Sequence, residues 1–169
     1  MQRVLLTGMS GTGKSSVICA LAARGYKAID ADTDEWSHWV DYVATPGEVA
    51  SPVEPERDWV WREDRLQQLL ALEDADILFV SGCAENMAQF YPQFDHIVLL
   101  SAPASVIVER LASRTNNAYG KHPDEVARVL ALMDSIEPLL RKSADAEIDT
   151  SVPLAQVVDA ILHLVRAQA

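Results

Sequence analysis

The chain has few cysteines, no long apolar run and few basic residues. Its two cysteines, Cys19 and Cys83, are too far apart in the sequence for metal-ligand spacing. We therefore expect reduced, partly buried thiols, and neither a disulfide nor a zinc site. Apolar residues make up 49% of the chain, but no run approaches the roughly 18 residues of a membrane span. The N-terminus enters a strand-like segment at once rather than a signal peptide, so we expect a cytoplasmic protein without membrane contact.

Acidic residues outnumber basic ones by 25 to 14, which gives a formal net charge of −11. Residues 30–64 hold eleven of the acids and only two bases, Arg57 and Arg62, so this segment has a local balance of −9. Such a surface repels a nucleic-acid backbone, and we expect no nucleic-acid partner. We interpret most of these acids as a solvated face. The four histidines have no nucleophile or metal spacing, and we assign them no catalytic role.

The segment from Gly8 to Ser15 fits the phosphate-binding pattern G-x-x-x-x-G-K-[ST] and follows an apolar run at 4–6. Its glycines allow a tight turn that directs backbone N–H groups at phosphate oxygens, at the positive end of the next helix. Lys14 is predicted to reach the β- and γ-phosphates, and the Ser15 hydroxyl to ligate Mg²⁺. The nucleotide-binding residues predicted from this loop are Gly8, Met9, Ser10, Gly11, Thr12, Gly13, Lys14, Ser15 and Ser16. We therefore expect ATP and Mg²⁺ as cofactors.

Short apolar runs alternate with helix-like patterns along the whole chain. The predicted strands are 3–7, 27–29, 76–80, 96–100 and 147–148, and the predicted helices are 14–24, 59–72, 103–114, 123–141 and 153–165. This alternation predicts an α/β fold of three layers, with a five-stranded parallel sheet and helices on both faces. We expect a single domain over 1–169, with a proline-broken loop at 45–55. Ligands bind at the carboxyl edge of such a sheet.

Asp30 and Asp32 lie at the carboxyl end of the second predicted strand, with Asp34 just beyond. One carboxylate there can hold Mg²⁺ through water beside Ser15, and another can accept the proton of an acceptor hydroxyl. We assign Asp30 to the metal and Asp32 to the acceptor, on opposite sides of the strand, and Asp34 to the substrate. Alternatively, Asp32 or Asp34 caps a helix that begins near residue 35. The strand at 76–80 ends without the usual second metal-binding acid, which leaves more of this task to Asp30.

These features together resemble the small P-loop kinases of the adenylate-kinase-like class, and shikimate kinases in particular. The resemblance implies a P-loop NTPase fold with a short lid at about 114–123, and a substrate contact at Gly82 and Cys83 in the turn after the third strand. It also implies that Arg110 stacks on adenine beside Pro153. The alternative for Arg110 is a solvated helix face.

The resemblance further implies that Arg114, together with Lys121, closes on the transferring phosphate. Two features depart from the shikimate kinase pattern. A glycine triplet is missing after the third strand, where Gly82 is followed by Cys83, and no arginine stands at 133–138 to bind a substrate carboxylate. Because a buried carboxylate without a paired cation is costly, shikimate itself is not the expected substrate.

All four tryptophans fall in the predicted acceptor-binding segment, about 30–65. Aromatic faces suit a base or a sugar, and the surrounding acids suit a cationic group, so we predict a neutral or amine-bearing acceptor. Trp36 is the tryptophan assigned to the substrate, with ordinary core packing as the alternative for the whole cluster. Arg62 stands where shikimate kinases have a substrate-contacting arginine, although a surface ion pair would also explain it.

The sequence thus predicts an ATP- and Mg²⁺-dependent phosphotransferase that acts on a hydroxyl of a small metabolite. Lys14, Asp32 and Arg114 are its predicted catalytic residues. One alternative is a nucleoside or nucleoside monophosphate kinase. Another is a nucleotide-dependent ATPase or switch, which the missing acid after the third strand disfavours. We expect a monomer or homodimer whose only other partner is the small-molecule acceptor.

Overall fold

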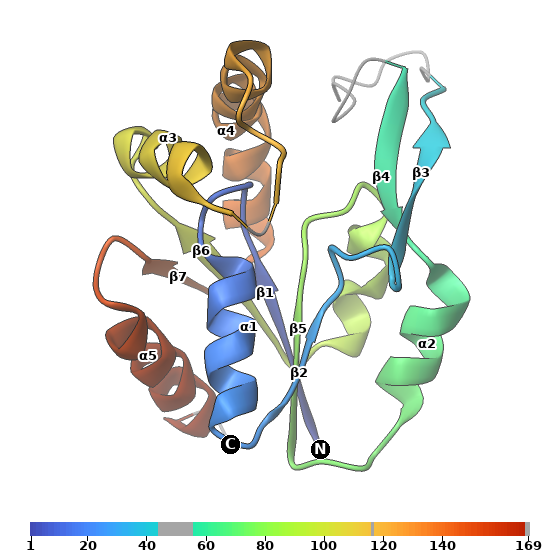
Figure 1. Ribbon diagram of the computed structural model, residues 1–169. Coiled ribbons are helices and arrows are strands. Elements are labelled where there is room, and N and C mark those ends of the chain that lie inside the picture. The colour runs from blue at the N-terminus through green and yellow to red at the C-terminus, as the bar shows by residue number, and fades with distance from the viewer. Residues whose placement is uncertain (44–55, 116, 168–169) are drawn as a thin grey trace.

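The computed structural model describes residues 1–43, 56–115 and 117–167. Its main sheet has five strands: β1 (Gln2–Thr7), β2 (Lys27–Asp30), β5 (Ile77–Ser81), β6 (His96–Ser101) and β7 (Ala146–Asp149). All neighbouring pairs are parallel, in the order β2-β5-β1-β6-β7 (Figure 1). The predicted α/β class with a five-stranded parallel sheet is confirmed.

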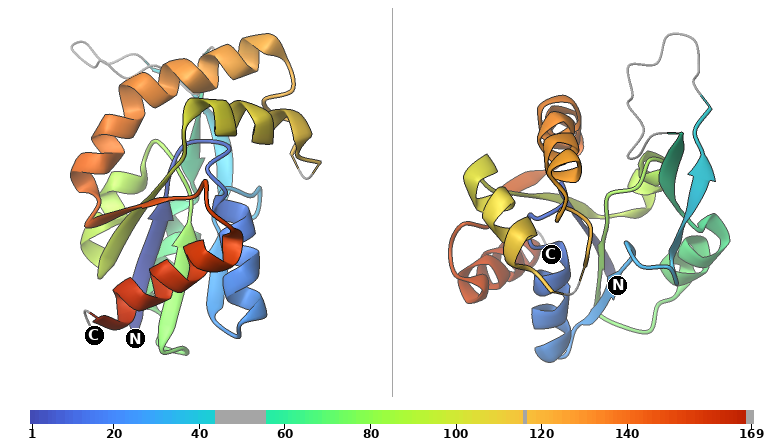
Figure 2. Two further views of the ribbon diagram at one scale, coloured as in Figure 1. Left: turned by 90° about the vertical axis from the view of Figure 1, so that its left-hand side faces the viewer. Right: turned by 45° about the horizontal axis from the view of Figure 1, so that its top comes forward.

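Helices cover both faces of this sheet, because its central strands β5, β1 and β6 are apolar on both sides. The helices are α1 (Lys14–Ala23), α2 (Glu63–Ala71), α3 (Ala104–Ser113), α4 (Pro123–Ser143) and α5 (Leu154–Ala167), with a 3₁₀ helix at Met87–Gln93. On β1, Val4 and Leu6 pack in one cluster with α1 and α5, whereas Leu5 packs in another with α2, the 3₁₀ helix and α4. Figure 2 shows α1 and α5 side by side on one face of the sheet. No helix in the described part of the chain is long and apolar enough to cross a membrane.

A second, two-stranded sheet is the main feature that the sequence did not predict. Strands β3 (Ser37–Asp41) and β4 (Arg57–Trp61) pair antiparallel, with Trp39 opposite Trp59. The predicted helix at 59–72 is therefore wrong in its first part, and α2 begins only at Glu63. In Figure 1 the hairpin extends beyond the carboxyl ends of the main strands, across from α3 and α4. The loop predicted at 45–55 lies outside the described residues.

Candidate active site

The turn between β1 and α1 depends on glycine at two positions. A Cβ atom at Gly8 would lie 2.3 Å from the carbonyl oxygen of Leu100, so a side chain there would collide with β6. Gly13 precedes α1 with a φ of 94°, in the left-handed region that favours glycine. No side chain of a described residue caps the start of α1, and its first turn has no acid. The unpaired N–H groups and the helix dipole therefore make this end a site for phosphate.

Lys14 and Asp32 meet above this turn. The buried Lys14 ammonium donates hydrogen bonds to the carbonyl oxygens of Gly8 (2.7 Å) and Met9 (3.2 Å), and it lies 3.7 Å from the Asp32 Oδ2 atom. The Cys83 N–H donates to Asp32 at 3.1 Å. Burial raises the pKa of Asp32 to about 6, although Lys14 and the Cys83 N–H oppose this shift. Such a carboxylate can take up and release a proton near neutral pH.

Asp30 accepts hydrogen bonds from two hydroxyl groups, one at the end of the phosphate-binding loop and one at the end of β5. The Ser15 hydroxyl donates to Asp30 Oδ2 at 2.5 Å, and the Ser81 hydroxyl donates to Oδ1 at 3.3 Å. Ser81 is the last residue of β5, the strand that ends without the usual second metal-binding acid. Mg²⁺ is commonly held by one or two carboxylates together with substrate phosphates, and the oxygens of Ser15 and Asp30 fit that donor set.

The expectation that Asp30 and Asp32 point to opposite sides is wrong, because β2 ends at Asp30 and strand alternation does not continue to Asp32. Both carboxylates face the phosphate-binding loop. The capping alternative for Asp32 and Asp34 is also wrong, since the element that follows them is strand β3 and not a helix.

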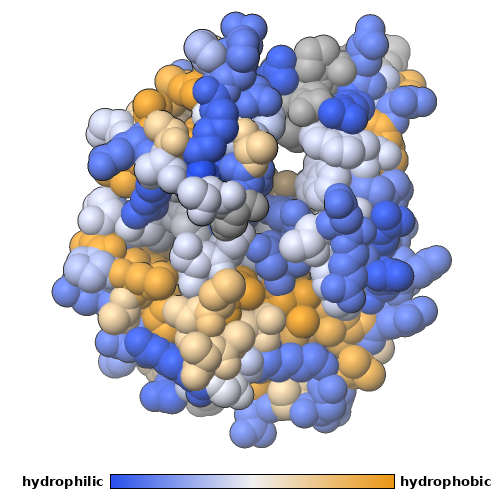
Figure 3. Space-filling view, viewed as in Figure 1, coloured by the Kyte–Doolittle hydropathy of each residue, from blue (hydrophilic) through white to orange (hydrophobic). Residues whose placement is uncertain are grey.

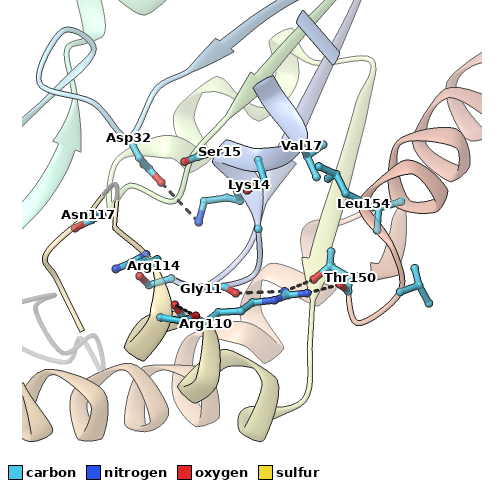
Figure 4. Close-up of a pocket in the computed structure, with 16 residues that line it drawn as sticks. Gly11, Lys14, Ser15, Val17, Asp32, Arg110, Arg114, Asn117, Thr150 and Leu154 are labelled. Atoms are coloured by element: carbon cyan, nitrogen blue, oxygen red, sulfur yellow. Dashed lines mark hydrogen bonds and ion pairs between the residues drawn. The ribbon is translucent and has the colours of Figure 1, made fainter. Parts of the chain in front are cut away.

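The first pocket, here called the phosphate-loop pocket, has a volume of about 390 Å³ and lies over the start of α1 (Figure 4). The predicted residues that line it are Ser10, Gly11, Gly13, Lys14, Ser15, Ser16, Asp32, Arg110 and Arg114. Val152, Leu154 and Val157 form an apolar part of its wall, and Pro153 lies between the first two. Gly8, Met9 and Thr12 shape the turn but are not among the lining residues.

Arg110 connects the phosphate-binding loop to the loop after β7. Its guanidinium donates to the Gly11 carbonyl oxygen at 3.4 Å, to the Thr150 hydroxyl at 2.9 Å and to the Thr150 carbonyl oxygen (Figure 4). The Thr150 hydroxyl in turn donates to the carbonyl oxygen of Thr12 at 2.7 Å. Arg110 is thus not on a solvated helix face. Thr150 was not among the site residues predicted from the sequence, although its position two residues after the last predicted strand is a signal for this edge of the sheet.

Arg114 and Lys121 differ in position, although both belong to the predicted lid, of which residue 116 lies outside the described part. Arg114 lines the phosphate-loop pocket and donates to the carbonyl oxygen of Tyr119, and burial lowers the pKa of its guanidinium. Lys121 lines neither this pocket nor the next one. Its ammonium donates to the carbonyl oxygens of Ala112 (2.7 Å) and Arg114, so it ties the lid to the end of α3.

A second pocket, here called the hairpin pocket, has a volume of about 650 Å³ and shares Ser10, Lys14, Asp32 and Asn117 with the first. Figure 3 shows the surface hollowed between the hairpin and the side formed by α3 and α4. Its other lining residues are Met9, Thr33, Asp34, Trp39, Arg57, Trp59, Cys83, Tyr119, Val129 and Leu132. The predicted substrate residues Asp32, Asp34 and Cys83 are therefore brought together.

Three other predicted substrate residues lie outside this lining. Trp36 packs against the core, and Arg62 donates to the carbonyl oxygen of Asp34 at 3.3 Å. Gly82 lies under Trp61, where a Cβ atom would come within 2.8 Å of the indole ring. Both explanations of the tryptophan cluster thus apply, since Trp36 and the fully buried Trp61 belong to the core whereas Trp39 and Trp59 line the pocket.

The chain is similar in sequence to known proteins. A family model described as an AAA domain matches residues 4–131. Shikimate kinase 2 of Yersinia enterocolitica is 29% identical over 180 residues, which cover 96% of this chain and 95% of that protein.

Two solved structures share the fold. The shikimate kinase from Acinetobacter baumannii in complex with shikimate has a TM-score of 0.66 and 17% identity, over 99% of this chain and 94% of its own. A gluconokinase from Sinorhizobium meliloti 1021 has a TM-score of 0.59 and 21% identity, over 98% and 93% of the two chains. The predicted likeness to small P-loop kinases is confirmed.

Proposed function

The chain belongs to the AAA-domain family, and on that premise we propose that it transfers the γ-phosphoryl group of ATP to a hydroxyl of a small metabolite. The main support for this proposal is the arrangement of residues where the two pockets join. There the Lys14 ammonium and the Asp32 carboxylate lie 3.7 Å apart, and both residues line both pockets. A phosphate donor in one pocket and a hydroxyl in the other would meet at these two groups.

The phosphate-loop pocket suits ATP in its polar and apolar parts. The start of α1 and Lys14 would bind the β- and γ-phosphates, and Ser15 with Asp30 would hold Mg²⁺. When bound, Mg²⁺ neutralises charge on the phosphate oxygens. The adenine ring would lie against Val152 and Leu154, beside the Arg110 guanidinium that Thr150 holds in place.

Asp32 is the residue that we assign to the proton. As the acceptor oxygen attacks the γ-phosphorus, its proton passes to Asp32 and the bond from that phosphorus to the β-phosphate oxygen breaks, which leaves ADP. Lys14 stabilises the charge on the transferring group, and Arg114 adds a second cation from the lid side.

We propose that the acceptor is not shikimate. Lys14 and Arg57 are the cations that line the hairpin pocket in the described part of the chain, and Lys14 is assigned to phosphate. Asp32 and Asp34 line the same pocket. A substrate carboxylate would therefore meet two acids and a single remaining cation, which is unfavourable where water is partly excluded.

The test is a coupled assay of ADP release over a panel of hydroxylated metabolites that includes shikimate, followed by ³¹P NMR of the products. We expect one phosphate ester per ADP formed, with shikimate among the poor acceptors. Release of inorganic phosphate at the same rate with and without any acceptor would instead indicate an ATPase.

A further inference from the structure

We propose that the acceptor is an uncharged alcohol with a flat ring, and that this ring lies against Trp39 and Trp59 in the hairpin pocket. The inference rests on the proposed function, because it names the substrate class of the same site. It concerns the pocket wall to which the hairpin contributes the side chains. The spacing of residues in the phosphate-binding loop does not predict which side chains form this wall.

Two walls of the pocket are apolar and face each other. Trp39 and Trp59 come from the hairpin, with ring centroids 4.9 Å apart and nearly edge to face, and Trp39 remains 37% exposed. Val129 and Leu132 come from α4 on the opposite side. Indole rings that are left accessible in a concave site offer an apolar surface that a flat ligand can cover.

The charges of the pocket favour an uncharged ligand body. Near the hairpin, Asp34 and Arg57 both line the pocket, and the Arg57 guanidinium lies 4.3 Å from the centre of the Trp39 ring. One acid and one base at this end give no net charge. At the other end, Lys14 and Asp32 are 3.7 Å apart and are occupied by the reaction itself. A ligand with one exposed hydroxyl and a neutral ring matches this arrangement.

The volume leaves room for a ligand with a ring. At about 650 Å³ the hairpin pocket is larger than the phosphate-loop pocket, at about 390 Å³. Pockets in this range take ligands of drug-like size, whose apolar parts contact the walls. An open-chain polyol would cover the accessible parts of the two indole rings less well than a flat ring, and it would gain less from them.

The inference can be tested by isothermal titration calorimetry with the full chain saturated by a non-hydrolysable ATP analogue. The probes are two flat-ring alcohols, uridine and pyridoxine, with ribose and glycerol as counterparts without a flat ring and uridine monophosphate as a charged counterpart. We expect at least one flat-ring alcohol to bind roughly tenfold or more tightly than its counterparts, since stacking on an aromatic side chain is worth about that much.

Three variants locate the binding. Trp59→Leu removes the flat ring of the indole and should lower the affinity for the alcohol by roughly tenfold. Trp59→Phe keeps an aromatic ring and should retain part of the affinity. Val40→Ala changes the same hairpin but leaves the pocket lining intact, and it should have no effect. All three should bind the ATP analogue like the parent, because neither residue lines the phosphate-loop pocket.

Tightest binding by ribose, glycerol or the monophosphate would overturn the inference, as would binding by no flat-ring alcohol or equal binding by Trp59→Leu. The proposed function fails differently. If a flat-ring alcohol binds but is never phosphorylated, the proposed function is wrong and the inferred binding of the ring in the hairpin pocket stands. If glycerol is phosphorylated efficiently and Trp59→Leu has no effect, the proposed function stands and the inferred binding of a ring in the hairpin pocket is wrong.

Discussion

The phosphate-loop pocket and the hairpin pocket meet at Lys14 and Asp32 but are built from different parts of the protein. The first is shaped mainly by backbone, namely the turn from Gly8 to Gly13, the start of α1 and the carbonyl oxygens that hold Arg110. The second takes its walls from side chains of the hairpin, the lid and α4. Backbone groups can bind the same phosphates in many proteins. The side chains that line an acceptor pocket can instead differ between proteins that bind different acceptors.

The largest effect is expected where the two pockets join. Lys14→Ala should lower turnover by roughly 10³-fold or more, because it removes the cation assigned to the transferring phosphate. It should also weaken ATP binding, since the Gly8 and Met9 carbonyl oxygens lose the group that fixes the loop. Steady-state kinetics would check this, with a substitution of the exposed Lys142 on α4, Lys142→Ala, as the control. Turnover at the parent rate would show that the loop does not bind the reacting phosphate.

Asp32→Asn should lower turnover by roughly 10²-fold, the usual contribution of a general base, and leave ATP affinity nearly unchanged. Asp32 has to be ionised to accept a proton, and its pKa is about 6. In the parent, kcat/KM should therefore fall as the pH drops below about 6 and level off above it. The pH–rate profile of the variant should lack this inflection. An unchanged profile would mean that another group takes the proton.

The same substitution should stabilise the fold. A pKa raised from 3.8 to about 6 means that ionised Asp32 destabilises the folded state. This cost begins near pH 3.8, grows up to about pH 6 and stays constant above, with an upper limit of about 3 kcal/mol. Thermal unfolding of Asp32→Asn should show a Tm above that of the parent at pH 8 and close to it at pH 4. A lower Tm at pH 8 would contradict the assigned burial effect.

Much of the phosphate-loop pocket could be predicted from the sequence because its determinants are local. The glycines, Lys14 and Ser15 lie within eight residues, and their spacing alone sets the turn. The alternation of short apolar runs and helix-like patterns likewise predicted the five-stranded sheet. Thr150 was missed since its role depends on contact with a loop far away in sequence.

The hairpin could not be predicted in the same way. Its strands are separated by residues 42–56, so no short turn motif joins them. Trp59, Val60 and Trp61 are aromatic and β-branched residues, which favour a strand, but the helix-like pattern of α2 follows so closely that both were assigned to one helix. The division of the tryptophans between core and pocket depends on where this hairpin stands, which is a tertiary property.

Within the phosphate-loop pocket, Thr150→Val should have an intermediate effect. The substitution keeps the shape of the side chain but removes a hydroxyl that donates to Thr12 and accepts from Arg110. Because one of these bonds is to a charged group, we expect the KM for ATP to rise roughly tenfold with a smaller change in kcat. The exposed Ser105→Ala on α3 serves as the control. Equal losses in kcat and in ATP affinity would show that Thr150 acts on the reaction rather than on nucleotide position.

The smallest effect is expected for Arg62→Ala, at the edge of the hairpin pocket. Arg62 lies outside the lining, and among the described residues its side chain makes one hydrogen bond, of 3.3 Å, to the carbonyl oxygen of Asp34. One such bond at an exposed position contributes little, so the acceptor KM should change by about threefold at most. Arg65→Ala is a matched control, because Arg65 donates in the same way to the carbonyl oxygen of Glu35 at 2.8 Å. A tenfold rise in acceptor KM for Arg62→Ala alone would instead support the substrate contact that the sequence predicted, and would extend the hairpin pocket to the start of α2.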